Sequence, residues 1–378
     1  MIAAPVAEAR SPQLFDRVAV LPGRLDYAMS STPDSTWNNS NINIAREELF
    51  VCIDDELVYA RFFADFGPLN LGQTVRFCQK INKKLNEEVE QAQQTNNNRS
   101  TPRTIVLVSS DHPHKRANAM NLLVLYLVIC HRQSPEQAMT PFKNLKAPFG
   151  FRDAACGVCT FFITILDCAR AVAKTQLWSF ETFSLDDYEH FDELHNGDIN
   201  WIVPGKVLAF SGPQKERVLL DPLHKGEGRG RTTLLAHEYA KLFRQLGVTC
   251  VVRFNETSTY DRKAFVHAGI QHLDLQYPDG GNPSDEILYK FIRTCERESG
   301  AVAVHCKAGL GRTGTNIAAF LTTKYRFTAV EAIACPYHLT KLFVYVFIGV
   351  DEEEEQQFSQ VAQSATTKWR RLVIVFMS

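Results

Sequence analysis

The sequence lacks any apolar run long enough to cross a membrane. A transmembrane helix needs ~20 consecutive apolar residues, and the longest candidates, Leu342–Val350 and Leu372–Met377, are far shorter. The N-terminus, Met1-Ile2-Ala3-Ala4-Pro5, also lacks the charged start and apolar stretch of a secretory signal. We therefore expect a protein that has no membrane partner and is not secreted.

The sequence also lacks an excess of charge of either sign and a cysteine framework. Its 41 Lys and Arg residues balance 42 Asp and Glu residues, so nucleic acid is not an expected partner. The 10 cysteines fall at no spacing typical of paired disulfides. A reducing cytosolic or nuclear compartment is favoured, and no pattern indicates a metal or an organic cofactor.

What the sequence does contain is an alternation of strand-like and helix-like segments. We expect strands at Phe50–Ile53, Val58–Phe62, Thr104–Val108, Trp201–Ile202, Val207–Phe210, Cys250–Phe254, His272–Leu275 and Ala301–Val304. We expect helices at Leu71–Leu85, Asn118–Ile129, Phe161–Gln176 and Glu286–Arg293, with a loop over Glu87–Ser100. This alternation predicts α/β layers. A strand–loop–helix arrangement occurs twice, at Thr104–Ile129 and Ala301–Tyr325, which predicts two related domains.

The most informative motif follows the last expected strand. It reads His305-Cys306-Lys307-Ala308-Gly309-Leu310-Gly311-Arg312-Thr313-Gly314. A loop that leaves a strand and enters a helix can turn its backbone N–H groups inward and cradle a phosphate, and its glycines permit the tight turn. We therefore expect Lys307, Ala308, Gly309, Leu310 and Gly311 to bind phosphate, with Arg312 as a planar clamp on two phosphoryl oxygens.

The same loop assigns chemical roles to its polar residues. Its N–H groups and the helix N-terminus stabilise a thiolate at Cys306, which would attack phosphorus in line and form a phospho-enzyme. Thr313 is expected to hydrogen-bond the sulfur, and His305 to orient the loop rather than act as a base. A lone cysteine is more often a buried structural thiol, but the complete motif favours catalysis.

Such a reaction also needs an acid that protonates the departing oxygen. The best candidate is Asp279, in the Gly- and Pro-rich run Tyr277–Gly281, where a mobile loop could carry it over the site. Asp274 lies within an expected strand and Asp285 is expected to cap the following helix, so both are weaker candidates.

At this point the residues resemble a known family. Between about Phe50 and Ala334 the chain resembles the cell-division-cycle-fourteen dual-specificity phosphatases. The resemblance rests on Phe66–Asn70, Lys115–Ala119, Phe151–Ala154, Asn196–Lys206 and the Cys306 loop. It implies an α/β fold of two tandem phosphatase-like domains, each a central mixed sheet flanked by helices. The first would be an inactive scaffold, because Ser109–Arg116 stands in place of the catalytic loop and holds no cysteine.

The resemblance also implies a domain plan. We expect a flexible arm over 1–43, the inactive domain over 44–180 and an acidic linker helix over 181–200. The catalytic domain would follow over 201–340, with a divergent segment over 341–378.

For function, the resemblance implies Cys306 as nucleophile, Arg312 as clamp and Asp279 as acid. Substrates would be phosphoserine-proline and phosphothreonine-proline sites followed by a basic residue, and phosphotyrosine, in opposition to cyclin-dependent kinases at mitotic exit. Asp186, Asp187 and Glu189 lie in an acidic stretch that would attract such a basic residue. The alternative is a solvated acidic helix face. The expected localisation is nuclear and cytoplasmic, with the nucleolus, spindle or centrosome as specific sites.

The resemblance stops after Ala334. The family continues with a Trp-rich helix and a glutamine loop, whereas this chain reads Cys335-Pro336-Tyr337 and then an apolar run. Pro336 is expected to break the helix there. A splice variant, a retained intron and a gene-model error would each produce such a break. Gln356-Gln357 is the nearest equivalent of the glutamine pair, and hydrolysis of the phospho-enzyme would be slowed without it.

Two other functions compete with a protein phosphatase. A phosphatase-like module could bind phosphorylated partners without turning them over, which the altered C-terminal segment favours. A phosphoinositide phosphatase could use a similar loop, but such sites usually carry a second basic residue where this chain has Leu310. The nearby acidic run would also repel a lipid headgroup.

Overall fold

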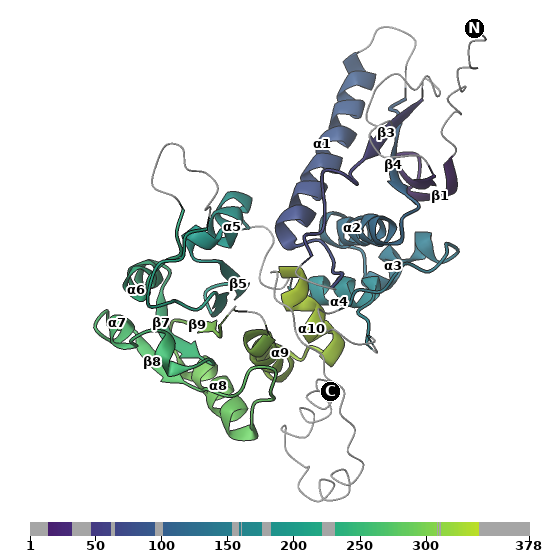
Figure 1. Ribbon diagram of the computed structural model, residues 1–378. Helices are drawn as coiled ribbons and strands as arrows, with labels where there is room; N and C mark the ends of the chain where they lie inside the picture. The colour runs from purple at the N-terminus through teal and green to yellow at the C-terminus, as the bar shows by residue number, and fades with distance from the viewer. Residues whose placement is uncertain are drawn as a thin grey trace, which may run out of the picture. The chain divides into compact units, whose positions relative to one another are not determined.

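The structure is a computed structural model that describes residues 14–31, 47–61, 65–94, 101–152, 159, 161–175, 183–220, 231–307, 309 and 311–339 (Figure 1). These residues form two compact units. The first lies within Met1–Ala60 and Gln73–Gly150, and the second within Arg61–Gly72 and Phe151–Ser378. Each unit contains one mixed sheet with helices against it. No helix in the described ranges is long and apolar enough to cross a membrane.

The first unit is built on a four-stranded sheet of order β1-β2-β4-β3. Its strands are β1 (Leu14–Leu21), β2 (Leu25–Ser30), β3 (Glu48–Cys52) and β4 (Thr104–Ser110). The β1–β2 pair is antiparallel, whereas β4 runs parallel to both β2 and β3. The predicted flexible arm over 1–43 is therefore wrong for Leu14–Ser30. Alternating apolar residues such as Leu25 and Tyr27 are fully buried there and hold β2 against β4.

The helices of the first unit are longer than the sequence suggested. They are α1 (Leu71–Gln94), α2 (Pro113–His131) and α3 (Pro135–Ala138), followed by the 3-10 turn η2 (Thr140–Phe142). The predicted loop over Glu87–Ser100 is wrong as far as Gln94, because Glu and Gln are good helix formers. Glu88 is also fixed by Arg103, whose Nε donates to Oε2 at 2.8 Å.

The second unit contains a five-stranded sheet of order β5-β6-β9-β7-β8. Its strands are β5 (Ile199–Val203), β6 (Val207–Phe210), β7 (Val248–Arg253), β8 (Gln271–Asp274) and β9 (Ala301–His305). β5 is antiparallel to β6, and the remaining pairs are parallel. The carboxyl ends of β6, β9, β7 and β8 therefore meet at one edge, where loops from several strands can converge on a site.

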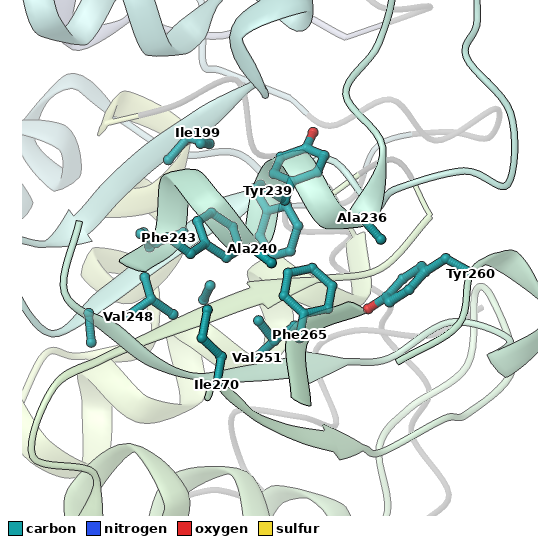
Figure 2. Close-up of a cluster of buried hydrophobic side chains, with 14 residues drawn as sticks. Ile199, Ala236, Tyr239, Ala240, Phe243, Val248, Val251, Tyr260, Phe265 and Ile270 are labelled. Carbon is teal, nitrogen blue, oxygen red and sulfur yellow. The ribbon is translucent and has the colours of Figure 1, made fainter. Parts of the chain in front are cut away.

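Helices cover both faces of this sheet. The helices α6 (Ala236–Gln245) and α7 (Lys263–Val266) pack on one face, where Phe243 and Phe265 meet Val251 in a continuous apolar core (Figure 2). The helices α8 (Asp285–Arg297) and α9 (Gly311–Tyr325) pack against the other, with Phe291 against Phe254. The short elements η5 (Leu194–Asn196) and η6 (Thr257–Thr259) complete the connections.

Two further helices of the second unit pack on each other. They are α4 (Ile165–Thr175) and α10 (Ala329–Leu339). Lys174 of α4 pairs with the buried carboxylate of Glu331 on α10 and also donates to the Arg326 carbonyl at 3.2 Å. The remaining helix of the unit, α5 (Leu185–Asp192), packs on β5.

Three local predictions fail for identifiable reasons. The expected strand at Val58–Phe62 is absent as far as Arg61, where the backbone is irregular. The cap of α8 is Ser284, whose hydroxyl accepts from the Ile287 N–H at 3.3 Å, and Asp285 is the first helical residue. Pro336 does not end α10, which continues to Leu339, because one missing N–H near a helix end costs a single hydrogen bond.

The core of the second unit makes a first prediction. Phe243 is 0% exposed and meets Phe210, Tyr239 and Phe265. Phe243→Ala should lower the free energy of unfolding by about 3–5 kcal/mol, because it leaves a cavity. Phe162→Ala, at a position that is 44% exposed, is the matched control and should cost far less. Equal losses in urea unfolding would show that this cluster is not the core.

Candidate active site

The Cys306 loop joins β9 to α9 at the carboxyl edge of the second sheet. β9 lies between β6 and β7 and ends at His305, and α9 begins at Gly311. Cys306 is only 4% exposed. Lys307 is exposed, whereas Ala308 and Leu310 lie outside the described residues. The loop therefore has the strand–loop–helix context that its predicted phosphate-binding role requires.

Two glycines allow the backbone to turn here. Gly309 has a φ of +73°, a left-handed conformation that favours glycine. Gly212, which follows β6, lies so close to the loop that a Cβ would sit 2.3 Å from the Cys306 carbonyl oxygen. The sequence analysis missed Gly212. A glycine two residues beyond a strand that pairs with β9 was the feature that could have indicated it.

The Arg312 guanidinium is hydrogen-bonded through one nitrogen, and its other two nitrogens make no hydrogen bond. Its side chain is 2% exposed, and Nη1 donates to the carbonyls of Tyr277 at 3.0 Å and Phe254 at 3.4 Å. The buried Nε and Nη2 make no hydrogen bond. These two nitrogens form one edge of the planar group, which matches two oxygens of a phosphate. The guanidinium is thus fixed with an unused pair of donors.

Asp279 lies next to this clamp, as predicted for the acid. Its Oδ1 is 3.3 Å from Arg312 Nε, although the N–H does not point at it and no hydrogen bond forms. The Asp279 side chain is 71% exposed. The backbone before it is anchored, because the buried Tyr277 donates its hydroxyl to the Arg312 carbonyl at 3.2 Å. A solvent-facing carboxylate on an anchored loop can reach a bound leaving group.

The competing acids are placed differently. Asp274 accepts from Arg253 Nε at 2.7 Å and lies 3.4 Å from Arg262 Nη1, so its charge is compensated within the fold. Asp285 is in the first turn of α8. A second carboxylate at the clamp, that of Glu256, was not predicted. Its Oε1 lies 3.7 Å from Arg312 Nη1 at the end of the β7 loop.

A chain of buried hydrogen bonds supports the loop from behind. His305 Nδ1 donates to the Cys306 carbonyl at 2.8 Å, so Nε2 is the acceptor and receives the Tyr260 hydroxyl proton at 2.7 Å. Tyr260 in turn accepts from His272 Nε2 at 2.8 Å. Arg253 closes the network, because Nη1 donates to the Tyr260 carbonyl at 2.9 Å and its guanidinium lies 4.4 Å from the Tyr260 ring centroid. Both ring nitrogens of His305 are engaged, as its predicted orienting role requires.

Burial keeps both histidines of this network neutral. Desolvation lowers the pKa of His305 to about 3 and that of His272 to about 4, and the nearby Asp274 carboxylate opposes the shift in both cases. A neutral His305 is consistent with a positioning role rather than with proton transfer during a reaction at neutral pH.

Thr313 does not make its predicted bond to the sulfur. Its hydroxyl is buried and has no hydrogen-bond partner.

The three predicted substrate-binding carboxylates, Asp186, Asp187 and Glu189, all lie on α5, which buries none of its residues. Ser184 caps this helix by accepting from the Asp187 N–H at 3.2 Å. The contact of the three carboxylates with a substrate stays a prediction. In the described part of the chain, no three His, Cys, Asp or Glu side chains are grouped to hold a metal.

Known proteins share both halves of this arrangement. Residues 19–175 match the family described as dual specificity protein phosphatase, N-terminal half, and residues 224–325 match a DSP-PTPase phosphatase of polymorphic toxin systems. The human dual specificity protein phosphatase CDC14C is 41% identical over 331 residues, which cover 86% of this chain and 67% of that protein. The chain belongs to the CDC14 family.

Other matches show the extent of the likeness. Human CDC14A is 41% identical over 334 residues, and the chain spans only 51% of its length. The crystal structure of Tk-PTP in the active form is 20% identical with a TM-score of 0.31, and the match covers 46% of this chain and 95% of that one. The resemblance of the sequence to the CDC14 family is therefore confirmed. The domain boundaries stay a prediction, since the N-terminal family match ends at residue 175 whereas Phe151 already belongs to the second compact unit.

In this CDC14-family chain the first unit repeats the strand–loop–helix arrangement without its chemistry. β4 leads into α2, but the connection holds no cysteine. The Ser110 N–H donates to the buried Asp54 carboxylate at 2.7 Å. Arg116 Nη2 donates to the Ala147 carbonyl at 2.8 Å. An internal carboxylate therefore accepts from one of the N–H donors that a phosphate would need, and the scaffold role of this unit stays a prediction.

The neutral histidines predict how stability depends on pH. The unfolded chain protonates His272 and His305 near pH 6.5, but the folded chain does so only near pH 4 and 3. The unfolded state therefore binds more protons in this window, and stability falls as the pH drops from about 6.5 toward 4. His272→Asn should reduce the slope of unfolding free energy against pH by about 1.4 kcal/mol per unit. The exposed His267→Asn is the control, and an identical slope in both variants would contradict the assignment.

Proposed function

We propose that the chain is a dual specificity protein phosphatase that works through a cysteinyl-phosphate intermediate. The observation that carries the proposal is the buried Arg312 guanidinium, whose Nε and Nη2 make no hydrogen bond while Nη1 is fixed by two carbonyls. Leaving buried donors unpaired costs free energy, so a site with two adjacent ones is built for an acceptor that binds there. A phosphate with a pair of oxygens fits this edge.

The reaction then proceeds in two balanced steps. In the first, Cys306 Sγ attacks phosphorus, the bond to the substrate oxygen breaks, and Asp279 gives that oxygen a proton. In the second, Asp279 takes a proton from water, the water oxygen attacks phosphorus, and the S–P bond breaks to release phosphate. Arg312 holds the phosphoryl oxygens throughout. The Thr313 hydroxyl, buried without a partner, is available to the sulfur as it leaves.

The substrate class is proposed from charge. Asp186 and Asp187 lie in the first turn of α5, with Glu189 following, and no residue of that helix is buried. If α5 lies beside the site, its negative charge would favour a basic residue after a phosphoserine-proline or phosphothreonine-proline pair. This preference suits opposition to cyclin-dependent kinases at mitotic exit, in the nucleus and cytoplasm.

The proposal is tested by hydrolysis of a phosphoserine-proline-x-lysine peptide. Cys306→Ser should abolish turnover. Asp279→Asn should lower it by about 10²–10⁴-fold and remove the fall in rate at higher pH, because that fall arises when the essential acid loses its proton. Arg312→Lys should lower kcat/KM strongly, because an ammonium cannot bind two oxygens side by side. Asp285→Asn, a nearby aspartate of α8, is the matched control and should retain activity.

Other results would redirect the proposal. Binding of the phosphopeptide by the folded protein without turnover would favour a phosphatase-like binding module. A single burst of product followed by a stall would place the defect in hydrolysis of the intermediate, which the altered sequence after Ala334 favours. Faster hydrolysis of phosphoinositides than of phosphopeptides would favour a lipid phosphatase.

The role of α5 has its own test. The triple variant Asp186→Asn, Asp187→Asn and Glu189→Gln should reduce the preference for lysine over alanine after proline by about 3–10-fold, since rim charges contribute modestly at physiological salt. Neutralising Asp285, Glu286 and Glu296 of α8 removes the same charge elsewhere and is the control. An unchanged preference in the α5 variant would leave these carboxylates as a solvated helix face.

A further inference from the structure

Two cysteines of the first unit lie side by side, far along the chain from the Cys306 loop. Cys78 is on α1 and is buried, and Cys130 is in the last turn of α2 and is half-buried. Their side chains are hydrogen-bonded to each other. Both are free thiols. The proposed phosphatase chemistry uses neither of them.

Neighbouring side chains aim a donor at Cys130. Asn82 lies one turn after Cys78 on α1, and Tyr126 lies one turn before Cys130 on α2. The Tyr126 hydroxyl donates to Asn82 Oδ1 at 2.7 Å, which fixes the orientation of the amide. Asn82 Nδ2 therefore faces the other way and donates to Cys130 Sγ at 3.7 Å. The sulfur of Cys130 thus accepts from an oriented amide and from a neighbouring thiol.

Such an arrangement stabilises a thiolate at Cys130. The hydrogen bond from Cys78 lowers the pKa of Cys130 to about 7 and outweighs the opposing effect of burial, with Asn82 adding to it. The pKa of Cys78 is raised by the same bond and by burial. Tyr126 and His131 of α2, and Arg24 of the turn between β1 and β2, are the other titratable groups in this neighbourhood.

The remaining buried cysteines provide a contrast. Burial raises the pKa of Cys168, Cys295 and Cys335, which keeps them as thiols at neutral pH. A thiolate, not a thiol, is the reactive nucleophile. Compared with these three cysteines, Cys130 is the sulfur better prepared for oxidation, and Cys78 is in place as the resolving thiol.

We propose that Cys130 and Cys78 form a peroxide-oxidisable dithiol that closes into a disulfide between α1 and α2. The Cys130 thiolate attacks one oxygen of hydrogen peroxide, the O–O bond breaks, and the products are Cys130 sulfenic acid and hydroxide. Cys78 then attacks the sulfenic sulfur, its proton leaves with the displaced hydroxide as water, and the S–S bond forms. Two thiols lose two electrons, and the peroxide gains them.

The disulfide would link α1 to α2 through two cysteines that lie about fifty residues apart in the sequence. Oxidation would therefore be expected to raise the temperature at which the first unit unfolds. This modification is independent of the proposed phosphatase activity, because its residues belong to a different compact unit from the Cys306 loop.

The test treats the full chain with hydrogen peroxide and maps disulfides by mass spectrometry after alkylation. The Cys306→Ser background removes the loop cysteine as a competing reactive thiol. A linked Cys78–Cys130 peptide, reversed by a dithiol reductant, is the expected result. The rate of its formation should rise with pH through about 7, as the thiolate of Cys130 forms. A merely structural pair would show no such profile.

Three variants locate the chemistry. Cys78→Ser should leave Cys130 as a sulfenic acid that a 1,3-dione reagent traps, whereas Cys130→Ser should lose both the link and the trapping. Asn82→Ala should slow the reaction several-fold and move its pH profile upward. Full retention of reduced Cys78 and Cys130 in the unmodified chain, under peroxide that oxidises Cys306, would overturn the proposal whether or not any variant folds.

Discussion

The phosphate clamp proposed for the second unit depends on one constraint. The buried Arg312 guanidinium must be fixed in place while two of its nitrogens make no hydrogen bond within the protein. Two carbonyls at the ends of neighbouring strand segments take one nitrogen of Arg312, and they leave an edge of the group unpaired. The parallel order of β9, β7 and β8 brings those carbonyls and the Cys306 loop to the same edge of the sheet. The two donors that make no hydrogen bond thus lie where a bound anion can accept from them.

The sequence was most informative where chemistry depends on neighbours along the chain. The Cys306 loop, its flanking strand and helix, and Asp279 were all identified from residue order, because short-range spacing fixes a nest and a clamp. Sheet strands such as β4 and β9 were also found from short apolar runs. Helix ends were predicted less well. The predicted helix ended at Leu85, but α1 continues to Gln94 because the Glu and Gln residues that follow are good helix formers.

What the sequence analysis missed depends on contacts between distant segments. No role was predicted for Tyr260 or His272, yet they fix the tautomer of His305 through two hydrogen bonds. Gly212 and Glu256 reach the loop from the ends of other strands. The β1–β2 pair was missed because half of β1 is exposed and shows no regular alternation of apolar residues, and the place of β2 beside β4 arises only from the parallel register. Such features require the fold to be known first.

The packing of α4 on α10 determines where the chain could be cut into separately folding parts. α4 lies in the part of the chain that matches the N-terminal half of its family, but it buries its apolar face, including Cys168 and Val172, in the second compact unit. Its Lys174 neutralises Glu331 and lies 5.3 Å from the ring centroid of Phe327. A catalytic fragment cut after α4 would expose the buried side of α10 and leave Glu331 without its cation. The boundary of the N-terminal family match and the boundary between the compact units therefore do not coincide.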